Sequence, residues 1–60
     1  MARIEAWGTG LRRYVIDVVN DGDASILVIY RKNSKKAIVQ LLLRGEERTR
    51  LIEALSRRGG

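Results

Sequence analysis

The stretch NDGDASILVIYRKNSKKAIVQLLL, residues 20–43, holds two apolar segments that are separated by a basic one. Gly22 near its start is typical of a tight hairpin turn, because glycine tolerates the positive φ angles that such turns need. Ala24 to Arg31 and Lys36 to Arg44 are rich in Ile, Val and Leu, and each predicts a strand. The basic segment RKNSKK, residues 31–36, is then a hairpin loop together with the strand ends beside it.

Two more strands are predicted before this stretch. Ala2 to Trp7 is a short first strand that ends at a Gly-Thr-Gly turn, and Leu11 to Val19 is a second. After Arg44 the spacing of apolar residues changes to that of a helix. The predicted fold is therefore α+β, a four-stranded antiparallel curved sheet followed by one C-terminal helix. Residues 1–60 are expected to form a single domain, in the order β-β-β-β-α.

The predicted helix has recognisable ends. Gly45 can serve as its N-cap, and Glu46 and Glu47 stand where the helix dipole favours negative charge. Its C-terminal end is expected at Arg57, Arg58 and Gly59. Three large apolar residues fall on one side of it: Leu51, Ile52 and Leu55. Such a helix can cover only one face of the sheet.

Alternation along the strands divides their side chains into two sets. The set expected under the helix is apolar: Tyr14, Ile16, Val18, Ala24, Ile26, Val28, Tyr30, Ala37, Val39, Leu41 and Leu43. The other set has apolar residues in its middle and cations at its ends: Arg13, Val15, Asp17, Leu27, Ile29, Arg31, Lys36, Ile38, Gln40, Leu42 and Arg44. Arg3 and Trp7 join this second set if the first strand continues the register. That composition suits contact with a flat anionic ligand or with a second copy of the protein.

Composition narrows the function classes. The 60 residues carry 12 Lys and Arg against 7 Asp and Glu, a net charge of +5, which favours nucleic acid as partner over plain solubility. Without Cys or His the chain has no disulfide, no zinc site and no usual acid-base residue, so we expect neither an enzyme nor a cofactor. Tight packing and self-association remain as stabilisers for so short a chain. No apolar run is long enough to span a bilayer, no secretion signal is evident, and a cytoplasmic, nucleoid-associated location is expected.

The predicted binding residues combine cations with two aromatic side chains. Arg31, Lys32, Lys35 and Lys36 are expected to contact phosphates, and Trp7 and Tyr30 are weaker candidates for stacking on bases. The full predicted set is Arg3, Trp7, Arg12, Arg13, Tyr30, Arg31, Lys32, Lys35, Lys36 and Arg44. The competing interpretation makes RKNSKK a merely solvated loop and Tyr14 and Tyr30 core residues.

The run RRYVIDVVNDGDASILVIYRKNSKKAIVQLLLRGEERTRLIEAL resembles the C-terminal domain of the Positive Cofactor Four transcriptional coactivators, which bind single-stranded DNA. The shared elements are the Arg13-Tyr14-Val15 start, Gly22 in a hairpin, an apolar third strand, the basic loop before Lys36-Ala37-Ile38, and an acidic helix start before Leu51. The resemblance implies a homodimer that pairs through helix and strands. It also implies DNA contacts from Arg13, Lys35 and Lys36. Two departures are the acidic turn at Asn20 to Asp23 and Ile29 where a cation is expected.

In size and character the chain is also similar to the small basic chromatin proteins of crenarchaea, and its composition is compatible with a thermophilic archaeon. The sequence thus predicts a DNA-binding protein without sequence preference. The expected ligand is single-stranded DNA, duplex DNA or both, with a role in chromatin organisation, single-strand protection or transcription. Two alternatives stay open: RNA binding, and a protein-interaction or dimerisation module that uses Val15, Leu27, Ile29 and Ile38.

Overall fold

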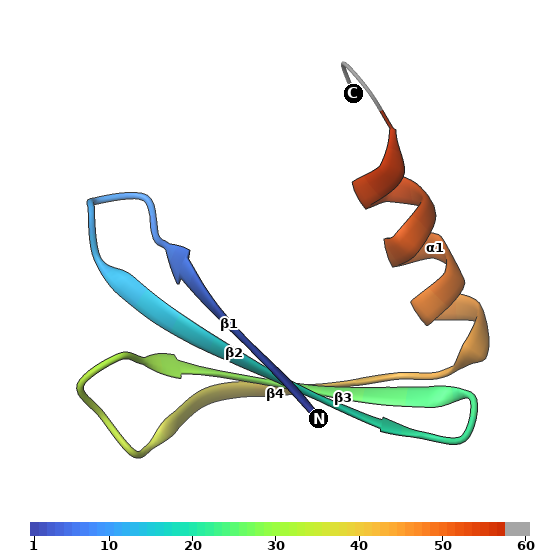
Figure 1. Ribbon diagram of the computed structural model, residues 1–60, viewed down its shortest axis with the longest axis horizontal. Coiled ribbons are helices and arrows are strands. Elements are labelled where there is room, and N and C mark those ends of the chain that lie inside the picture. The colour runs from blue at the N-terminus through green and yellow to red at the C-terminus, as the bar shows by residue number, and fades with distance from the viewer. Residues whose placement is uncertain (58–60) are drawn as a thin grey trace.

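A computed structural model describes residues 1–57 and contains one sheet and one helix (Figure 1). The elements are β1 (Ala2–Trp7), β2 (Arg13–Asp21), β3 (Ala24–Arg31), β4 (Ala37–Leu43) and α1 (Gly45–Ser56). The strands are antiparallel, and each lies beside its neighbour in sequence, in the order β1-β2-β3-β4. The predicted α+β fold with four antiparallel strands and a C-terminal helix is confirmed.

The two ends of the sheet differ in what they carry. The β1–β2 loop and the β3–β4 loop lie at one end, and the β2–β3 turn and the start of α1 lie at the other (Figure 1). The RKNSKK segment is therefore the end of β3 and the loop before β4, as predicted, and the β1–β2 loop is its neighbour in space. Loop charges that are distant in sequence are brought together at this end.

The β2–β3 turn fixes which side chains share a face. Asp21 pairs with Ala24, so the turn contains only Gly22 and Asp23. Gly22 has φ +63°, a conformation that L side chains rarely adopt, and among residues 1–57 Asp23 is not one of those with positive φ. Positive φ at the first turn residue alone is the pattern of a type II′ hairpin turn. A two-residue turn makes even-numbered residues of β2 share a face with odd-numbered residues of β3.

The predicted faces of β3 were therefore wrong. Leu27 and Ile29 lie on the side of the sheet that α1 faces, opposite Val18 and Ile16. The residues predicted under the helix lie on the other side: Ala24, Ile26, Val28 and Tyr30. The prediction placed the odd-numbered residues of β2 and the odd-numbered residues of β3 on the same face. A shift of one residue in the pairing moves every side chain of a strand to the opposite face.

A β-bulge at the start of β4 places Ala37 on the face opposite to the predicted one. Ile29 pairs with Val39 but Tyr30 pairs with Ala37, so β4 carries an extra residue at this point. Ala37 consequently lies beside Tyr30 and away from the helix, contrary to the prediction. Beyond the bulge the prediction holds, because the later odd-numbered residues of β4 lie on the side of α1: Val39, Leu41 and Leu43.

The sheet thus has two distinct faces. The helix-side face includes Ile4, Tyr14, Ile16, Val18, Leu27, Ile29, Val39, Leu41 and Leu43. The face turned away from α1, called here the open face, includes Arg3, Glu5, Trp7, Arg13, Val15, Asp17, Ile26, Val28, Tyr30 and Ala37. By its pairing with Tyr14, Arg31 follows the helix-side alternation and not that of the open face, although it stands at the strand end.

The element boundaries show smaller differences from the prediction. β2 begins at Arg13, because Leu11 has φ +62° and belongs to a loop in which the Gly8 N–H donates to the Arg12 carbonyl at 2.6 Å. The N-cap of α1 is Arg44 rather than Gly45, and its N–H donates to Oε1 of Glu47 at 3.2 Å. The helix ends at Ser56 with Arg57 as its C-cap, and the predictions for Arg58 and Gly59 fall outside the described residues.

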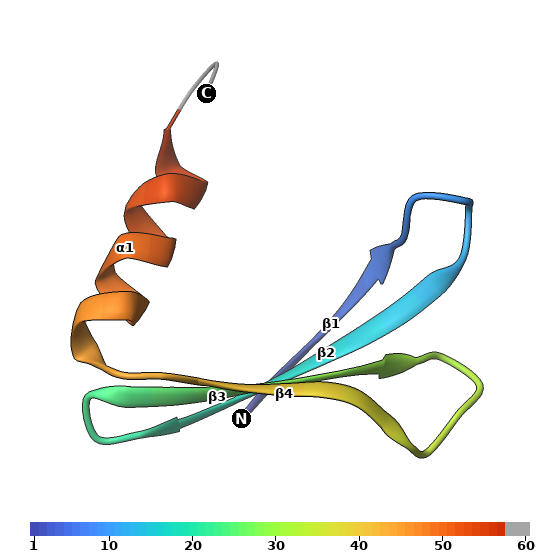
Figure 2. The same ribbon diagram turned by 180° about the vertical axis from the view of Figure 1, so that it is seen from behind.

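The helix stands away from the sheet and does not lie flat on it (Figures 1 and 2). Its polar anchor is Arg48, whose Nη1 lies 3.4 Å from the Gly22 carbonyl and 3.5 Å from both the Ala24 carbonyl and Oγ of Ser25. None of the residues of α1 is buried. Within residues 1–57 only Val15 and Ser25 are buried, so a closed hydrophobic core is missing from the single chain.

No helix among the described residues has both the length and the apolar character required to cross a bilayer.

Candidate nucleic-acid interface

Cationic side chains converge at the loop end of the sheet. Arg12, Arg13, Arg31 and Lys32 line a hollow of about 470 Å³, here called the basic hollow, together with Asn33 and Ser34. Two backbone hydrogen bonds hold its rim: the Lys32 N–H donates to the Arg13 carbonyl at 3.3 Å, and the Ser34 N–H donates to the Arg31 carbonyl at 3.0 Å. Four of the predicted binding residues, from two loops and the strand ends beside them, therefore share one site.

An exposed tryptophan adjoins the basic hollow. Trp7 pairs with Arg13 across β1 and β2, and the Arg13 guanidinium lies over the indole, 4.1 Å from the ring centroid. This is a cation–π contact. Trp7 is nevertheless 66% exposed. A large, fixed aromatic surface that remains in water is suited to stacking on an unpaired base.

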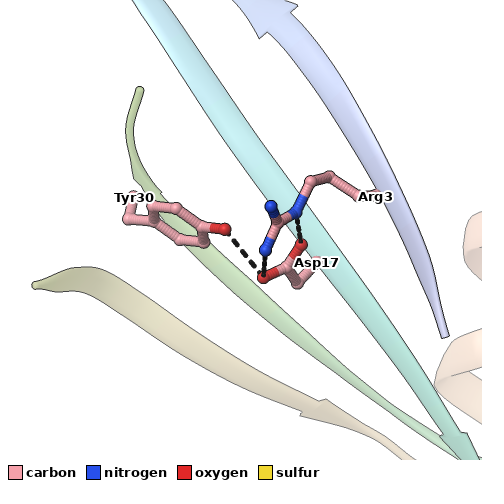
Figure 3. Close-up of polar contacts among 3 residues, drawn as sticks. All are labelled: Arg3, Asp17 and Tyr30. Atoms are coloured by element: carbon pink, nitrogen blue, oxygen red, sulfur yellow. Dashed lines mark hydrogen bonds and ion pairs between the residues drawn. The ribbon is translucent and has the colours of Figure 1, made fainter. Parts of the chain in front are cut away.

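A hydrogen-bonded trio occupies the middle of the open face (Figure 3). Arg3 donates to both carboxylate oxygens of Asp17, from Nε to Oδ1 at 2.8 Å and from Nη2 to Oδ2 at 3.2 Å. The Tyr30 hydroxyl donates to Oδ2 of Asp17 at 2.8 Å. Tyr30 is therefore not the core residue considered in the sequence analysis. Its ring lies on the open face, held by a carboxylate.

The same contacts change how these groups titrate. The hydrogen bonds from Arg3 and then from Tyr30 lower the pKa of the Asp17 carboxyl. The hydrogen bond to Asp17 raises the pKa of the Tyr30 hydroxyl and also that of Arg3. All three groups thus keep at neutral pH the charge state that the trio requires.

Glu5 is a member of the open face that the sequence analysis did not single out. Its Oε1 lies 2.8 Å from Nζ of Lys32 and 3.8 Å from Nη2 of Arg13. The hydrogen bond from Lys32 lowers the pKa of Glu5. The alternation of β1 would have placed Glu5 on the open face, because Arg3 and Trp7 were assigned there.

The ion pairs involve only some of the predicted cations. Among residues 1–57, Arg3, Arg13 and Lys32 each have a carboxylate within 4 Å. Five other predicted cations have none among the described residues: Arg12, Arg31, Lys35, Lys36 and Arg44. Of these five, all but Arg44 lie at the loop end of the sheet, and the middle of the open face is largely neutralised.

Of the remaining predicted residues, Lys35 and Lys36 lie near the loop end of the sheet and Arg44 lies at the other end. Lys35 lines a shallow hollow on the open face with Arg3, Asp17 and Tyr30, and the Lys36 N–H donates to Oγ of Ser34 at 3.2 Å. A neighbouring hollow has Val15 among its walls, with Arg3, Glu5, Tyr30 and Lys32. Arg44 lies beyond Leu43, which pairs with Ser25 near the β2–β3 turn, so it stands at the other end of the sheet.

Comparisons with protein-family models, with curated proteins and with solved structures found no match to this chain.

Proposed function

We propose that this protein binds DNA without sequence preference, with single-stranded DNA as its first ligand, through the basic hollow and the adjoining open face. The observation that carries the proposal is the convergence of Arg12, Arg13, Arg31 and Lys32 on one hollow. Cations that face the same space bind phosphates and release the counterions condensed on the nucleic acid. This binding does not depend on contacts with base edges.

Trp7 supports the preference for an unpaired strand. Its indole is exposed beside the basic hollow and is held by Arg13. A base can reach such a ring only when it is not stacked within a duplex. The helix does not favour major-groove reading, because α1 has 12 residues, starts with Glu46 and Glu47, and turns its apolar side chains toward the sheet.

The deciding experiment is fluorescence anisotropy with labelled single-stranded DNA, duplex DNA and RNA of equal length, titrated with the protein at several salt concentrations. We expect the strongest binding to single-stranded DNA. The logarithm of affinity should fall linearly with that of salt, by about 0.7 per phosphate contacted on a single strand and about 0.9 on a duplex.

Other outcomes of the anisotropy experiment would change the assigned ligand. Equal or tighter binding of duplex DNA would favour a role like that of chromatin proteins, and tighter binding of RNA would replace DNA as the ligand. Absence of binding to all three at low salt would overturn the proposal and leave RKNSKK as a solvated loop.

A further inference from the structure

The hydrogen-bonded trio on the open face leaves part of the Arg3 side chain unused. A guanidinium carries five N–H donors in one plane. Asp17 accepts from one side of that plane, from Nε at 2.8 Å and from Nη2 at 3.2 Å. Two parallel N–H groups remain at the tip, one on Nη1 and one on Nη2, and they donate to no acceptor in residues 1–57. Figure 3 shows both nitrogens on the Tyr30 side of the trio.

Asp17 fixes the direction in which this free pair of donors points. Two hydrogen bonds to one carboxylate hold the guanidinium in a single orientation, and the Tyr30 hydroxyl holds the carboxylate in turn at 2.8 Å. The Arg3 side chain is nevertheless 62% exposed, whereas that of Asp17 is only 16% exposed. A ligand therefore meets donors that are already in place, and little conformational entropy is lost when it binds.

The free donors border two shallow hollows of the open face. The hollows have volumes of about 510 and 520 Å³, and Arg3 and Tyr30 are walls of both. Val28 lines one and Val15 the other. An aromatic ring, an apolar wall and oriented donors together suit a nucleobase. Both hollows lie on the opposite side of the sheet from the apolar groove, a space of about 410 Å³ that α1 forms with the helix-side face.

The balance of charge at the trio favours a base over a phosphate. A phosphate at the tip of Arg3 would be attracted by the guanidinium and repelled by the Asp17 carboxylate beside it. Cations without a carboxylate partner among residues 1–57 lie nearby at the loop end, Arg31 and Lys35 among them. A base edge is uncharged and meets no such repulsion. Phosphates are therefore expected at the loop end and a base at the trio.

Guanine matches the free donors better than the other bases. Its O6 and N7 are adjacent acceptors on one edge, which is the edge that arginine binds with two parallel hydrogen bonds. Adenine has a donor in place of O6, and thymine separates its two acceptors by a donor. Cytosine has adjacent acceptors in O2 and N3, but O2 lies beside the sugar, which hinders the approach of a guanidinium.

We infer that Arg3, oriented by Asp17, binds the O6 and N7 edge of a guanine that rests against Tyr30 in single-stranded DNA. This inference rests on the proposed function and names the base that the open face takes. Lys35 lines the same hollow as Arg3, so a cation stands near the phosphate of that nucleotide. The phosphate contacts stay independent of sequence. The guanine contact adds a bias for guanine-rich strands and defines no recognition sequence.

Fluorescence anisotropy tests the inference with short labelled strands in which thymine alternates with guanine, hypoxanthine, 7-deazaguanine or cytosine. Hypoxanthine keeps O6 and N7, whereas 7-deazaguanine has a carbon in place of N7 and stacks as guanine does. The guanine and hypoxanthine strands should bind at least about fivefold tighter than the cytosine strand, and 7-deazaguanine should lose most of that advantage. The ratio should persist as salt rises, because the base edge is uncharged.

Arg3→Lys is the variant that removes the paired donors. It replaces the planar fork by one ammonium group, so the guanine strand should bind no tighter than the cytosine strand. Arg50→Lys is the matched control, since Arg50 on α1 is also paired with a carboxylate, from Nη2 to Oε1 of Glu46 at 2.6 Å. It should keep the preference for guanine. The four strands test the native chain as well, so a failure of Arg3→Lys to fold by circular dichroism does not remove the test.

Three results would overturn the guanine contact and leave the proposed DNA binding in place. They are equal binding of all four strands, binding of 7-deazaguanine as tight as that of guanine, and an intact preference in Arg3→Lys. The second result would show that stacking alone favours the purine. Absence of binding to every strand at low salt would overturn both the contact and the proposed function.

Discussion

The guanidinium of Arg13 lies over the ring of Trp7, at 4.1 Å from the ring centroid, and the indole remains mostly exposed. Because Trp7 is the only tryptophan, its emission reports directly on ligands that reach this position. Single-stranded DNA should change the Trp7 fluorescence on binding. Trp7→Leu should lower the affinity for single-stranded DNA by about 1 to 3 kcal/mol, the usual worth of one stacked base.

The control for this prediction is Trp7→Phe, which keeps an aromatic ring and should retain most of the affinity. Binding to duplex DNA should change little in either variant, because its bases are stacked on one another. Equal losses for both DNAs would show that Trp7 supports the sheet rather than a base.

The loop lysines offer a test of the electrostatic site. Lys35→Glu combined with Lys36→Glu should weaken DNA binding by about tenfold or more at low salt and should reduce the salt dependence, because two free cations become anions. Both side chains are exposed, so the melting temperature should be unchanged. Anisotropy and thermal circular dichroism measure the two effects.

Arg50→Glu combined with Arg57→Glu is the matched control, since it makes the same change in net charge on and after α1. It should leave most of the affinity in place. If both double variants lose affinity equally, only the total charge of the protein matters, and the loop is not a site.

Glu5 should oppose phosphate binding. Its carboxylate occupies the space in front of Lys32 and Arg13, where a phosphate oxygen would otherwise accept. Glu5→Gln should therefore tighten DNA binding several-fold and steepen the salt dependence by about one phosphate contact, 0.7 for a single strand. Glu53→Gln on α1 changes the net charge equally and should have a smaller effect. A weaker complex with Glu5→Gln would mean that Glu5 positions these cations for the ligand.

Asp17 gives the protein a defined response to acid. Its pKa in the folded chain is below the ordinary value of 3.8, chiefly because of the hydrogen bonds from Arg3 and Tyr30. The stabilisation is thus fully present above about pH 3.8 and is lost as the pH falls through the lower folded value. Asp17→Asn should flatten the fall in stability over that acidic range. Chemical denaturation at a series of pH values measures it, and an unchanged slope would contradict the prediction.

Gly8 has a steric role at the end of β1. A Cβ built on Gly8 would overlap the ring of Tyr14, which lies against its backbone. Gly8→Ala should therefore destabilise the fold by about 1 to 3 kcal/mol, the usual cost of overpacking. Thr9→Ala in the same loop should be nearly neutral, because Thr9 is exposed. A normal melting temperature for Gly8→Ala would show that the Tyr14 ring can move aside.

The sequence was sufficient to predict the four strands, the helix and their order. The signals are local ones: segments with alternating apolar residues, an Asp-Gly turn and an acidic helix start. It was not sufficient for the faces of β3. Those depend on whether the turn at Gly22 contains two residues or three, and the NDGD cluster permits both. Tyr30 was consequently expected in the core, although it lies on the open face beside Asp17.

The sequence predicted which cations form the candidate site, but it did not predict which of them are paired with carboxylates. The basic loop RKNSKK was evident from the sequence, and the pairing of β2 with β3 brought Arg12 and Arg13 to it. The contact of Glu5 with Lys32 was not predictable, because it joins the first strand to a loop 27 positions later across the β2–β3 pair. Contacts between residues on non-adjacent strands can be predicted only when the register of the strands between them is known.

The sheet is a single layer with the apolar groove on one side and the open face on the other, and the basic hollow lies at its loop end. The walls of the basic hollow and those of the groove have no residue in common, since the first are residues 12, 13 and 31–34. A substitution in one of them therefore leaves every wall of the other unchanged, so the two surfaces can be varied independently within one thin layer.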